Sequence, residues 1–223
     1  MNATGQRGAP PERRRPAWQV GAVTVVGFVL LLYLVEVVDV ATGHQLDRNG
    51  IRPLQTDGLV GVLFAPLLHA DWQHLLANTA PALVLGFLMT LAGPARFVLA
   101  TAIIWIVGGL GTWLIGNIGV HCPYVGVSCE SVHIGASGLI FGWLTFLIVF
   151  GFFTRKAWEI VVGVVVLFLY GGILWGVLPG TVGVSWQAHL CGAAAGVLAA
   201  YLLSGPERRA RAGRGRPTPS AAP

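Results

Sequence analysis

Six long apolar segments dominate this sequence of 223 residues and restrict it to one class of fold. An α-helix needs about 20 apolar residues to cross the hydrocarbon core of a bilayer, and each segment reaches about that length. Helix-breaking or charged residues separate consecutive segments, as in Gly93-Pro94 and Arg155-Lys156. The predicted spans are residues 17–38, 72–92, 97–116, 134–153, 157–177 and 186–204.

The composition supports this interpretation, because only 10% of the residues are charged and 55% are hydrophobic. A soluble domain usually carries about 25% charged residues. The sequence therefore predicts an all-α polytopic membrane protein with a six-helix bundle over residues 17–204. Residues 1–16 are expected to form a basic cytoplasmic tail, and residues 205–223 a disordered basic tail on the same side. The first segment is too long for a signal-peptide core, so it is interpreted as a retained span.

The distribution of Lys and Arg predicts the orientation. If the N-terminus is cytoplasmic, twelve of the 14 basic residues lie inside, and only Arg48 and Arg52 lie outside. Both termini are therefore expected in the cytoplasm. The net charge of +5 is explained by this topology, and no basic face that would suit nucleic acid is found between the tails. All six histidines, at 44, 69, 74, 121, 133 and 189, then fall outside or in the outer part of a span.

Four polar residues lie inside the predicted spans, where polar groups are costly and usually face a bundle interior or a cavity. His74 and Asn78 are one helical turn apart on the second span. Ser137 lies about three residues into the fourth span, and His189 about three residues into the sixth. Because each residue rises about 1.5 Å along a helix, all four are expected at a similar depth near the outer face.

Packing alone can also explain these residues, since a serine among glycines often packs and His74 with Asn78 can bond between helices. Their common depth and the small residues beside them favour a site instead. Those small residues, spaced four apart, are Gly138 and Gly142 on the fourth span and Ala188, Gly192 and Gly196 on the sixth. Such faces let two helix backbones approach closely, as a hydrogen bond between Ser137 and His189 requires.

The four residue types suit acyl transfer. A serine hydroxyl becomes a nucleophile when a base takes its proton, and His189 is the candidate base. The imidazole of His74, the amide of Asn78 and the backbone N–H of Ser137 are donors for a developing oxyanion. Since no carboxylate lies close to them within the spans, a Ser–His dyad is the simplest assignment.

These segments resemble the rhomboid family of intramembrane serine proteases in its bacterial, six-helix form. Residues 69–78 are similar to the paired-His and Asn motif of the family, and residues 135–138, Gly-Ala-Ser-Gly, match its nucleophile motif. Residues 189–196 match the sixth-helix motif, in which the base precedes two glycines four apart. The resemblance covers residues 50–203, with each motif on its expected span.

The resemblance implies that Ser137 is the nucleophile and His189 the general base of an endopeptidase. It implies that His74 and Asn78, with the Ser137 amide, form the oxyanion hole. The implied substrate is a transmembrane segment of another protein, cut near its outer end within the lipid bilayer. The resemblance also implies that residues 39–71 fold partly into the outer leaflet and that the fifth helix moves sideways to admit substrate. It implies no metal and no cofactor.

Further residues are placed beside the site by the same resemblance, namely His69, Gly135 and Phe141. Phe141 stands where many family members carry a tyrosine that packs against the base, so its ring can stack but lacks the hydroxyl. The Trp-Arg pair that is common in the first outer loop of the family is not evident here.

Two cysteines, Cys122 and Cys129, lie in the outer loop before the fourth span, and the sequence leaves a disulfide and free thiols both open. With His121 and His133 they also suggest a metal site, but the spacing matches no zinc pattern.

Two other functions remain as alternatives. A small-solute transporter or proton channel predicts embedded carboxylates or inverted repeats, whereas Glu36 and Glu159 lie near span ends and no repeat is seen. A catalytically inactive rhomboid-like module that binds membrane proteins predicts loss of the serine or the histidine, and this chain has both. The sequence does not specify an oligomeric state.

Overall fold

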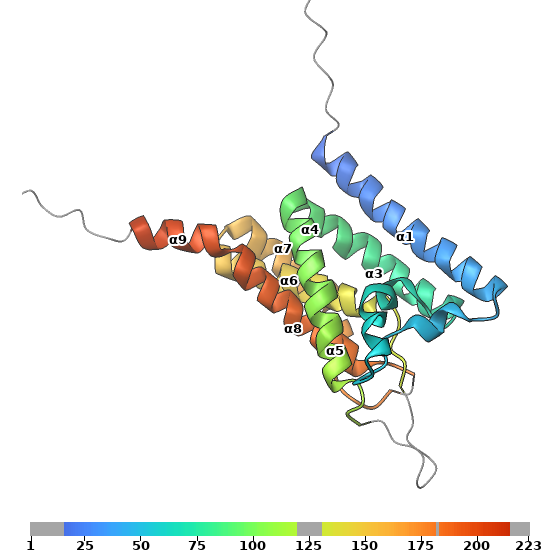
Figure 1. The fold of residues 1–223 in the computed structure, drawn as a ribbon. Helices are drawn as coiled ribbons and strands as arrows, with labels where there is room; N and C mark the ends of the chain where they lie inside the picture. Colours follow the sequence, from blue (N-terminus) through green and yellow to red (C-terminus); the bar gives the residue numbers. More distant parts are fainter. Residues whose placement is uncertain (1–15, 120–130, 182, 215–223) are drawn as a thin grey trace, which may run out of the picture.

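The structure is a computed structural model that describes residues 16–119, 131–181 and 183–214, and Figure 1 shows its helical bundle. Within these residues, six helices are long and apolar enough to cross a membrane. They are Ala17–Ala41, Trp72–Leu91, Pro94–Ile115, Ser137–Thr154, Ala157–Val177 and Trp186–Gly213. The prediction of an all-α, multi-pass membrane protein with six spans is therefore confirmed.

The helices follow the six spans in order. The first and second spans are α1 (Ala17–Ala41) and α3 (Trp72–Leu91), and the third comprises α4 (Pro94–Ile103), a π-helical segment (Ile104–Gly108) and α5 (Gly109–Ile115). The fourth is α6 (Ser137–Thr154), and the fifth is α7 (Ala157–Tyr170) extended by a 3-10 segment (Gly171–Val177). The sixth is α8 (Trp186–Leu203), followed by α9 (Gly205–Arg214). The loop after α1 holds α2 (Gly61–Phe64) and short 3-10 segments at Leu46–Asn49, Asp57–Leu59 and Ala65–Leu67.

Capping residues set the N-terminal ends of α3 and α8. The Asp71 carboxylate accepts the N–H of His74 at 2.7 Å, and the Ser185 hydroxyl accepts the N–H of Ala188 at 3.2 Å. Side-chain oxygens at these positions satisfy amides that have no partner within the helix. Both helices thus begin a few residues before the polar side chains that they carry.

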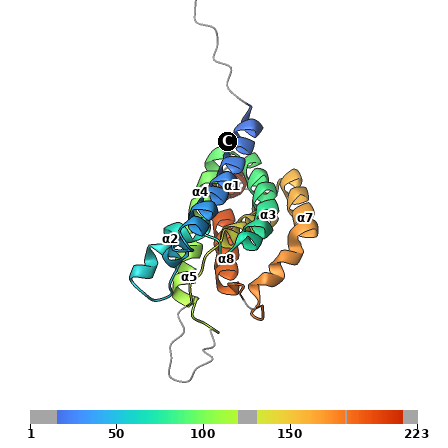
Figure 2. The same ribbon diagram turned by 90° about the vertical axis from the view of Figure 1, so that its right-hand side faces the viewer.

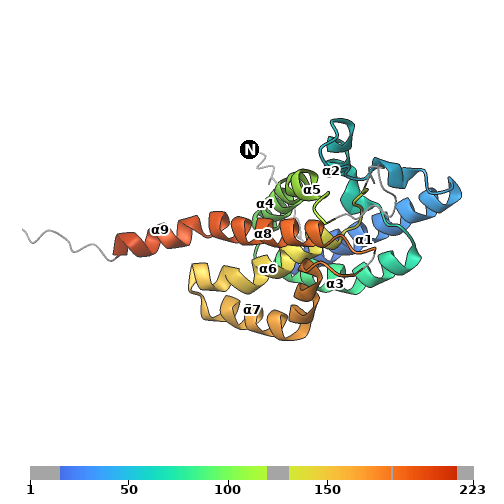
Figure 3. The same ribbon diagram turned by 90° about the horizontal axis from the view of Figure 1, so that it is seen from below.

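Helix α6 is the centre of the bundle, and α7 lies at its rim. In the most apolar 18-residue stretch of each span, 61% of the residues are buried for α6 but only 11% for the fifth span, which contains α7. Figure 3 shows α6 between α7 and α8, and Figure 2 shows α7 at the edge of the molecule. The fifth span is therefore the one that contacts the rest of the protein least.

Backbone-to-backbone contact joins α6 to α8. A Cβ atom at Gly192 would fall on the carbonyl oxygen of Gly138, and one at Gly196 would fall on that of Gly142. Across the same interface the Thr145 hydroxyl donates to the carbonyl of Ala193 at 2.8 Å. The two small-residue faces predicted from the sequence thus meet each other.

The loop between α1 and α3 is bound to the third span and to the start of the fourth. The indoles of Trp105 and Trp113 donate to the carbonyls of Val62 and Gln55 at 2.9 and 2.8 Å. An isolated antiparallel bridge pairs Ile51 with His133, a residue just before α6. Figure 2 shows the resulting position of α2 beside α5.

The prediction that residues 205–223 are disordered is wrong for its first part, because residues 205–214 form α9. Glu207 in its first turn pairs with Arg96 and Lys156. The Arg211 guanidinium donates to the carbonyls of Phe153 and Thr154 at the end of α6, which lack helical partners. These tertiary contacts stabilise a polar helix that continues the line of α8 (Figure 3).

The glycine contact makes a direct prediction for stability. The Gly192→Ala variant should lower the free energy of unfolding by about 1–3 kcal/mol, because its Cβ forces α6 and α8 apart. The measurement is denaturant unfolding in detergent followed by circular dichroism. The control is Gly27→Ala in α1, where an added Cβ has nothing within 4 Å and should be neutral or stabilising. Equal stability of the two variants would contradict this account of the interface.

Candidate active site

Ser137 and His189 form a hydrogen-bonded pair across the α6–α8 interface. Ser137 is the first residue of α6, and His189 is the fourth residue of α8. The imidazole Nε2 lies 2.8 Å from the serine Oγ. Ser137 directly precedes Gly138, and His189 lies three residues before Gly192. The contact between these two glycines therefore brings the side chains within hydrogen-bonding distance.

A backbone carbonyl determines which ring nitrogen of His189 carries the proton. Nδ1 lies 2.9 Å from the carbonyl oxygen of Gly176, in the 3-10 end of the fifth span. Because a carbonyl oxygen only accepts, Nδ1 of the neutral ring is the donor and Nε2 is left as an acceptor. The Ser137 hydroxyl therefore donates to Nε2, the arrangement in which a base removes a proton from serine.

Phe141 fixes the plane of the imidazole. Its ring stacks on that of His189 with centroids 4.1 Å apart and an angle of 9° between the planes. A Cβ at Gly176 would press on both rings, so this glycine at the end of the fifth span packs tightly against the pair. The stacking expected for a phenyl ring at this position is thus observed.

His74 and Asn78 lie on the other side of Ser137, on α3. Gly135 has a positive φ of 119°, and a Cβ there would press against the His74 imidazole. Glycine is therefore needed both for the backbone turn and for the approach of His74. The Asn78 Nδ2 donates to the carbonyl of His74 at 2.9 Å, and a primary amide carries a second N–H.

These groups line one cavity of about 380 Å³. Its polar side chains are His74, Asn78, Ser137, Ser185 and His189, and its apolar walls include Pro81, Ile140, Phe141, Ile173 and Val184. The structure thus brings together all four polar residues that the sequence placed at one depth. A hydroxyl paired with an imidazole, facing N–H donors across a cavity, is an arrangement suited to acyl transfer.

His69 lies behind this cavity. Its Nε2 accepts the backbone N–H of Ala136 at 3.4 Å, and its ring meets that of His74 edge to face, 5.1 Å apart. Burial, with a contribution from the charge of His74, lowers the pKa of His69 to about 4. The neutral ring thus supports the turn that precedes Ser137 and does not line the cavity.

Two contacts of the site, made by the Gly176 carbonyl and by His133, were not predicted from the sequence. The Gly176 carbonyl is a backbone group, which any residue supplies. His133 bonds through Nδ1 to the hydroxyl of Ser185 at 2.5 Å and through Nε2 to that of Ser131 at 3.1 Å. Burial lowers the pKa of His133, and its ring holds the N-cap of α8.

The suggested disulfide of Cys122 with Cys129, and the metal alternative with His121, lie outside the described residues.

Comparisons with known proteins agree with the motifs. Residues 56–206 match the family model described as "Rhomboid domain". An uncharacterized protein of Mycobacterium tuberculosis is 67% identical over 202 residues, which cover 89% of this chain and 82% of the relative. An uncharacterized protein of Mycobacterium leprae is 59% identical over 202 residues, which cover 89% of this chain and 78% of that relative. A Bacillus subtilis protein, named provisionally as a rhomboid protease, is 42% identical over 77 residues, 34% of this chain and 33% of that protein.

The low pKa of His69 predicts an acid-dependent loss of stability. The folded state binds this proton less readily than the unfolded state, in which the pKa is near 6.5, so stability is fully present above pH 6.5 and falls toward pH 4. The contribution is about 3 kcal/mol for a shift of this size. The His69→Gln variant keeps an acceptor for Ala136 but does not titrate. Between pH 7 and pH 4 its free energy of unfolding should therefore fall by about 3 kcal/mol less than that of the wild type.

The measurement is denaturant unfolding of both proteins at the two pH values. The other titrating groups are common to both, so the difference between the two losses isolates His69. Identical losses would contradict the assignment of a neutral, buried acceptor.

Proposed function

Because the chain belongs to the rhomboid family, we propose that it is an intramembrane serine endopeptidase that cleaves transmembrane segments of other proteins. The hydrogen bond between the Ser137 hydroxyl and His189 Nε2, formed across two separate spans, carries this proposal. A serine that only packs between helices needs no imidazole partner, and a buried histidine can form hydrogen bonds to groups other than a serine. Their pairing inside a cavity is what a nucleophile and its base require.

In the proposed reaction, the Ser137 oxygen attacks the carbonyl carbon of a peptide bond while its proton passes to His189 Nε2. The Gly176 carbonyl holds the Nδ1–H and stabilises the imidazolium that forms. Breakdown of the tetrahedral intermediate breaks the C–N bond, and the proton on Nε2 goes to the leaving amine. Water then repeats the sequence on the acyl-serine and releases the new carboxyl end.

The oxyanion of each tetrahedral intermediate is the group that gains charge. The proposed donors are the His74 imidazole, the second N–H of Asn78 and the backbone N–H of Ser137 at the start of α6. An amide at a helix N-terminus has no helical partner and favours negative charge. Preorganised donors of this kind usually provide the largest single contribution to catalysis of acyl transfer.

The surroundings support a membrane-embedded substrate. The cavity has apolar walls from α3, α6 and the 3-10 end of the fifth span, and α7 is the least buried span. We place the site near the extracytoplasmic face of the cell membrane, with both termini cytoplasmic. His74 and His189 occupy the first turns of α3 and α8, at the opposite end of the bundle from the network of Arg96, Lys156 and Glu207.

Removal of the nucleophile or the base tests the proposal. Purified protein in detergent should cleave a model single-span substrate, and Ser137→Ala and His189→Ala should each lower the rate by at least about 10³-fold. A fluorophosphonate probe should label the wild type and not the Ser137→Ala variant. The matched control is Ser204→Ala, which removes a buried hydroxyl at the far end of α8 and should retain activity.

Cleavage by the Ser137→Ala variant at the wild-type rate would reject the mechanism. Binding of the single-span protein without any cleavage by the wild type would instead favour the inactive, rhomboid-like binding module. The two outcomes are read from the same assay by following both the intact substrate and its fragments.

The stacking of Phe141 makes a separate prediction. The Phe141→Leu variant should lower kcat by about threefold to tenfold, because an aromatic stack is worth about 0.5–1.5 kcal/mol beyond its buried area. Phe141→Tyr keeps the ring and should retain most of the activity. Steady-state kinetics on the single-span substrate provide the measurement, and equal kcat for the Leu variant and the wild type would contradict an orienting role.

A further inference from the structure

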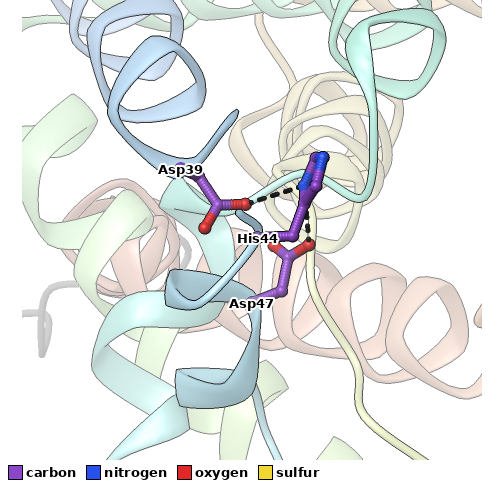
Figure 4. A group of neighbouring side chains, drawn as sticks. All are labelled: Asp39, His44 and Asp47. Atoms are coloured by element: carbon purple, nitrogen blue, oxygen red, sulfur yellow. Dashed lines mark hydrogen bonds and ion pairs between the residues drawn. The ribbon is translucent and has the colours of Figure 1, made fainter. Parts of the chain in front are cut away.

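A second group of titratable side chains lies at the outer end of α1, outside the Ser137 cavity. Figure 4 shows the imidazole of His44 beside the carboxylates of Asp39 and Asp47. His44 Nδ1 lies 3.2 Å from Asp39 Oδ2 and 3.8 Å from Asp47 Oδ2. One oxygen or nitrogen atom from each of the three residues lies within 4.8 Å of the others.

A third carboxylate belongs to the same region and is buried without a partner. Glu36 lies one turn before Asp39 on the same face of α1 and is 1% exposed. Neither of its carboxylate oxygens has a hydrogen-bond partner among the described residues. The charges of Asp47, Asp39 and His44, and that of Asp71, act on it, so its carboxylate lies close to this group. An ionisable side chain buried in a membrane span needs a partner.

No permanent positive charge balances these carboxylates in the described part of the chain. Among the described residues, the ion pairs of Asp39 and Asp47 are to His44 alone, and Arg52 of the same loop binds Asp57 instead. The group also lies at the C-terminal end of α1, where the helix dipole favours a cation and where no basic residue stands. Excess negative charge is therefore built into this end of the helix.

We propose that Asp39, His44 and Asp47 bind a divalent transition-metal cation, Zn²⁺ or Mn²⁺, with the Glu36 carboxylate as the third negative group of the site. One imidazole nitrogen together with carboxylate oxygens suits these ions better than Ca²⁺ or Mg²⁺, which take oxygen ligands alone. Ligand atoms about 2.1 Å from one ion lie at most about 4.2 Å apart, so side-chain shifts of less than 1 Å close the site. His44 is 48% exposed, which leaves the ion a path from water.

The bound cation would fasten the end of α1 to the first outer loop. Asp39 already accepts the backbone N–H of Leu46 at 2.6 Å, and His44 stands in the left-handed region with a φ of 57°. The ion adds a link between the helix and Asp47 in the Leu46–Asn49 segment. It plays no part in the proposed peptide cleavage, so it does not depend on the function assigned to Ser137.

Direct binding measurements test this site. Untagged full-length protein in detergent is stripped with EDTA and titrated with Zn²⁺, Mn²⁺, Ca²⁺ or Mg²⁺ by isothermal calorimetry, and bound metal is counted by mass spectrometry. We expect one Zn²⁺ or Mn²⁺ per chain, a raised Tm with that ion, and weaker binding of Ca²⁺ and Mg²⁺. Asp47→Asn and Glu36→Gln should each weaken binding by at least about tenfold, since even outer partners of metal ligands change affinity by 10-fold to 100-fold.

The variants also carry a signature that a misfolded protein would not show. Without metal, Glu36→Gln and Asp47→Asn should unfold at the wild-type Tm or above it, because each removes repulsion between carboxylates. The matched control is Asp57→Asn, an exposed carboxylate of the same loop, which should bind metal as the wild type does. Absence of bound metal in the wild type, equal affinity in Asp47→Asn, or preference for Ca²⁺ would overturn the proposal.

Discussion

The close contact between the backbones of α6 and α8 is the constraint on which the rest of the site depends. In lipid, apolar side chains gain little by meeting one another, so helices associate where small residues let their backbones approach. Gly138 faces Ala188 and Gly192, and Gly142 faces Gly196, with no room for a Cβ at either of the α8 glycines. Ser137 and His189 adjoin the first of these contacts, and their separation follows from it. The position of the proposed nucleophile is thus a consequence of packing.

Much of this arrangement could be predicted from the sequence because it depends on residue type and spacing. Span positions follow from apolar length, and the depth of Ser137 and His189 follows from their distance from each span start. The glycine spacing predicted the interface, and Gly135 could be placed by its motif. The boundaries moved by only a few residues, since Asp71 and Ser185 cap helices that the hydropathy pattern had already located.

The remaining features depend on backbone groups and on contacts between distant segments. The partner of His189 Nδ1 is a carbonyl at Gly176, which no side-chain pattern reveals. The tail composition predicted disorder, but Arg211 binds the carbonyl groups at the end of α6 and stabilises α9. Glu36 looks like an ordinary charge near a span end, and only the folded chain shows that it is buried without a partner.

The Gly176 carbonyl has a consequence for how this scaffold can be altered. It belongs to the fifth span, the segment with the smallest buried share, which also contributes Ile173 to the apolar wall of the cavity. The same seven-residue 3-10 segment therefore forms part of the cavity wall and supplies the acceptor that sets the tautomer of His189. Substitutions that reshape this wall will therefore also change the basicity of the imidazole, so substrate choice and turnover would not be independent traits of the proposed protease.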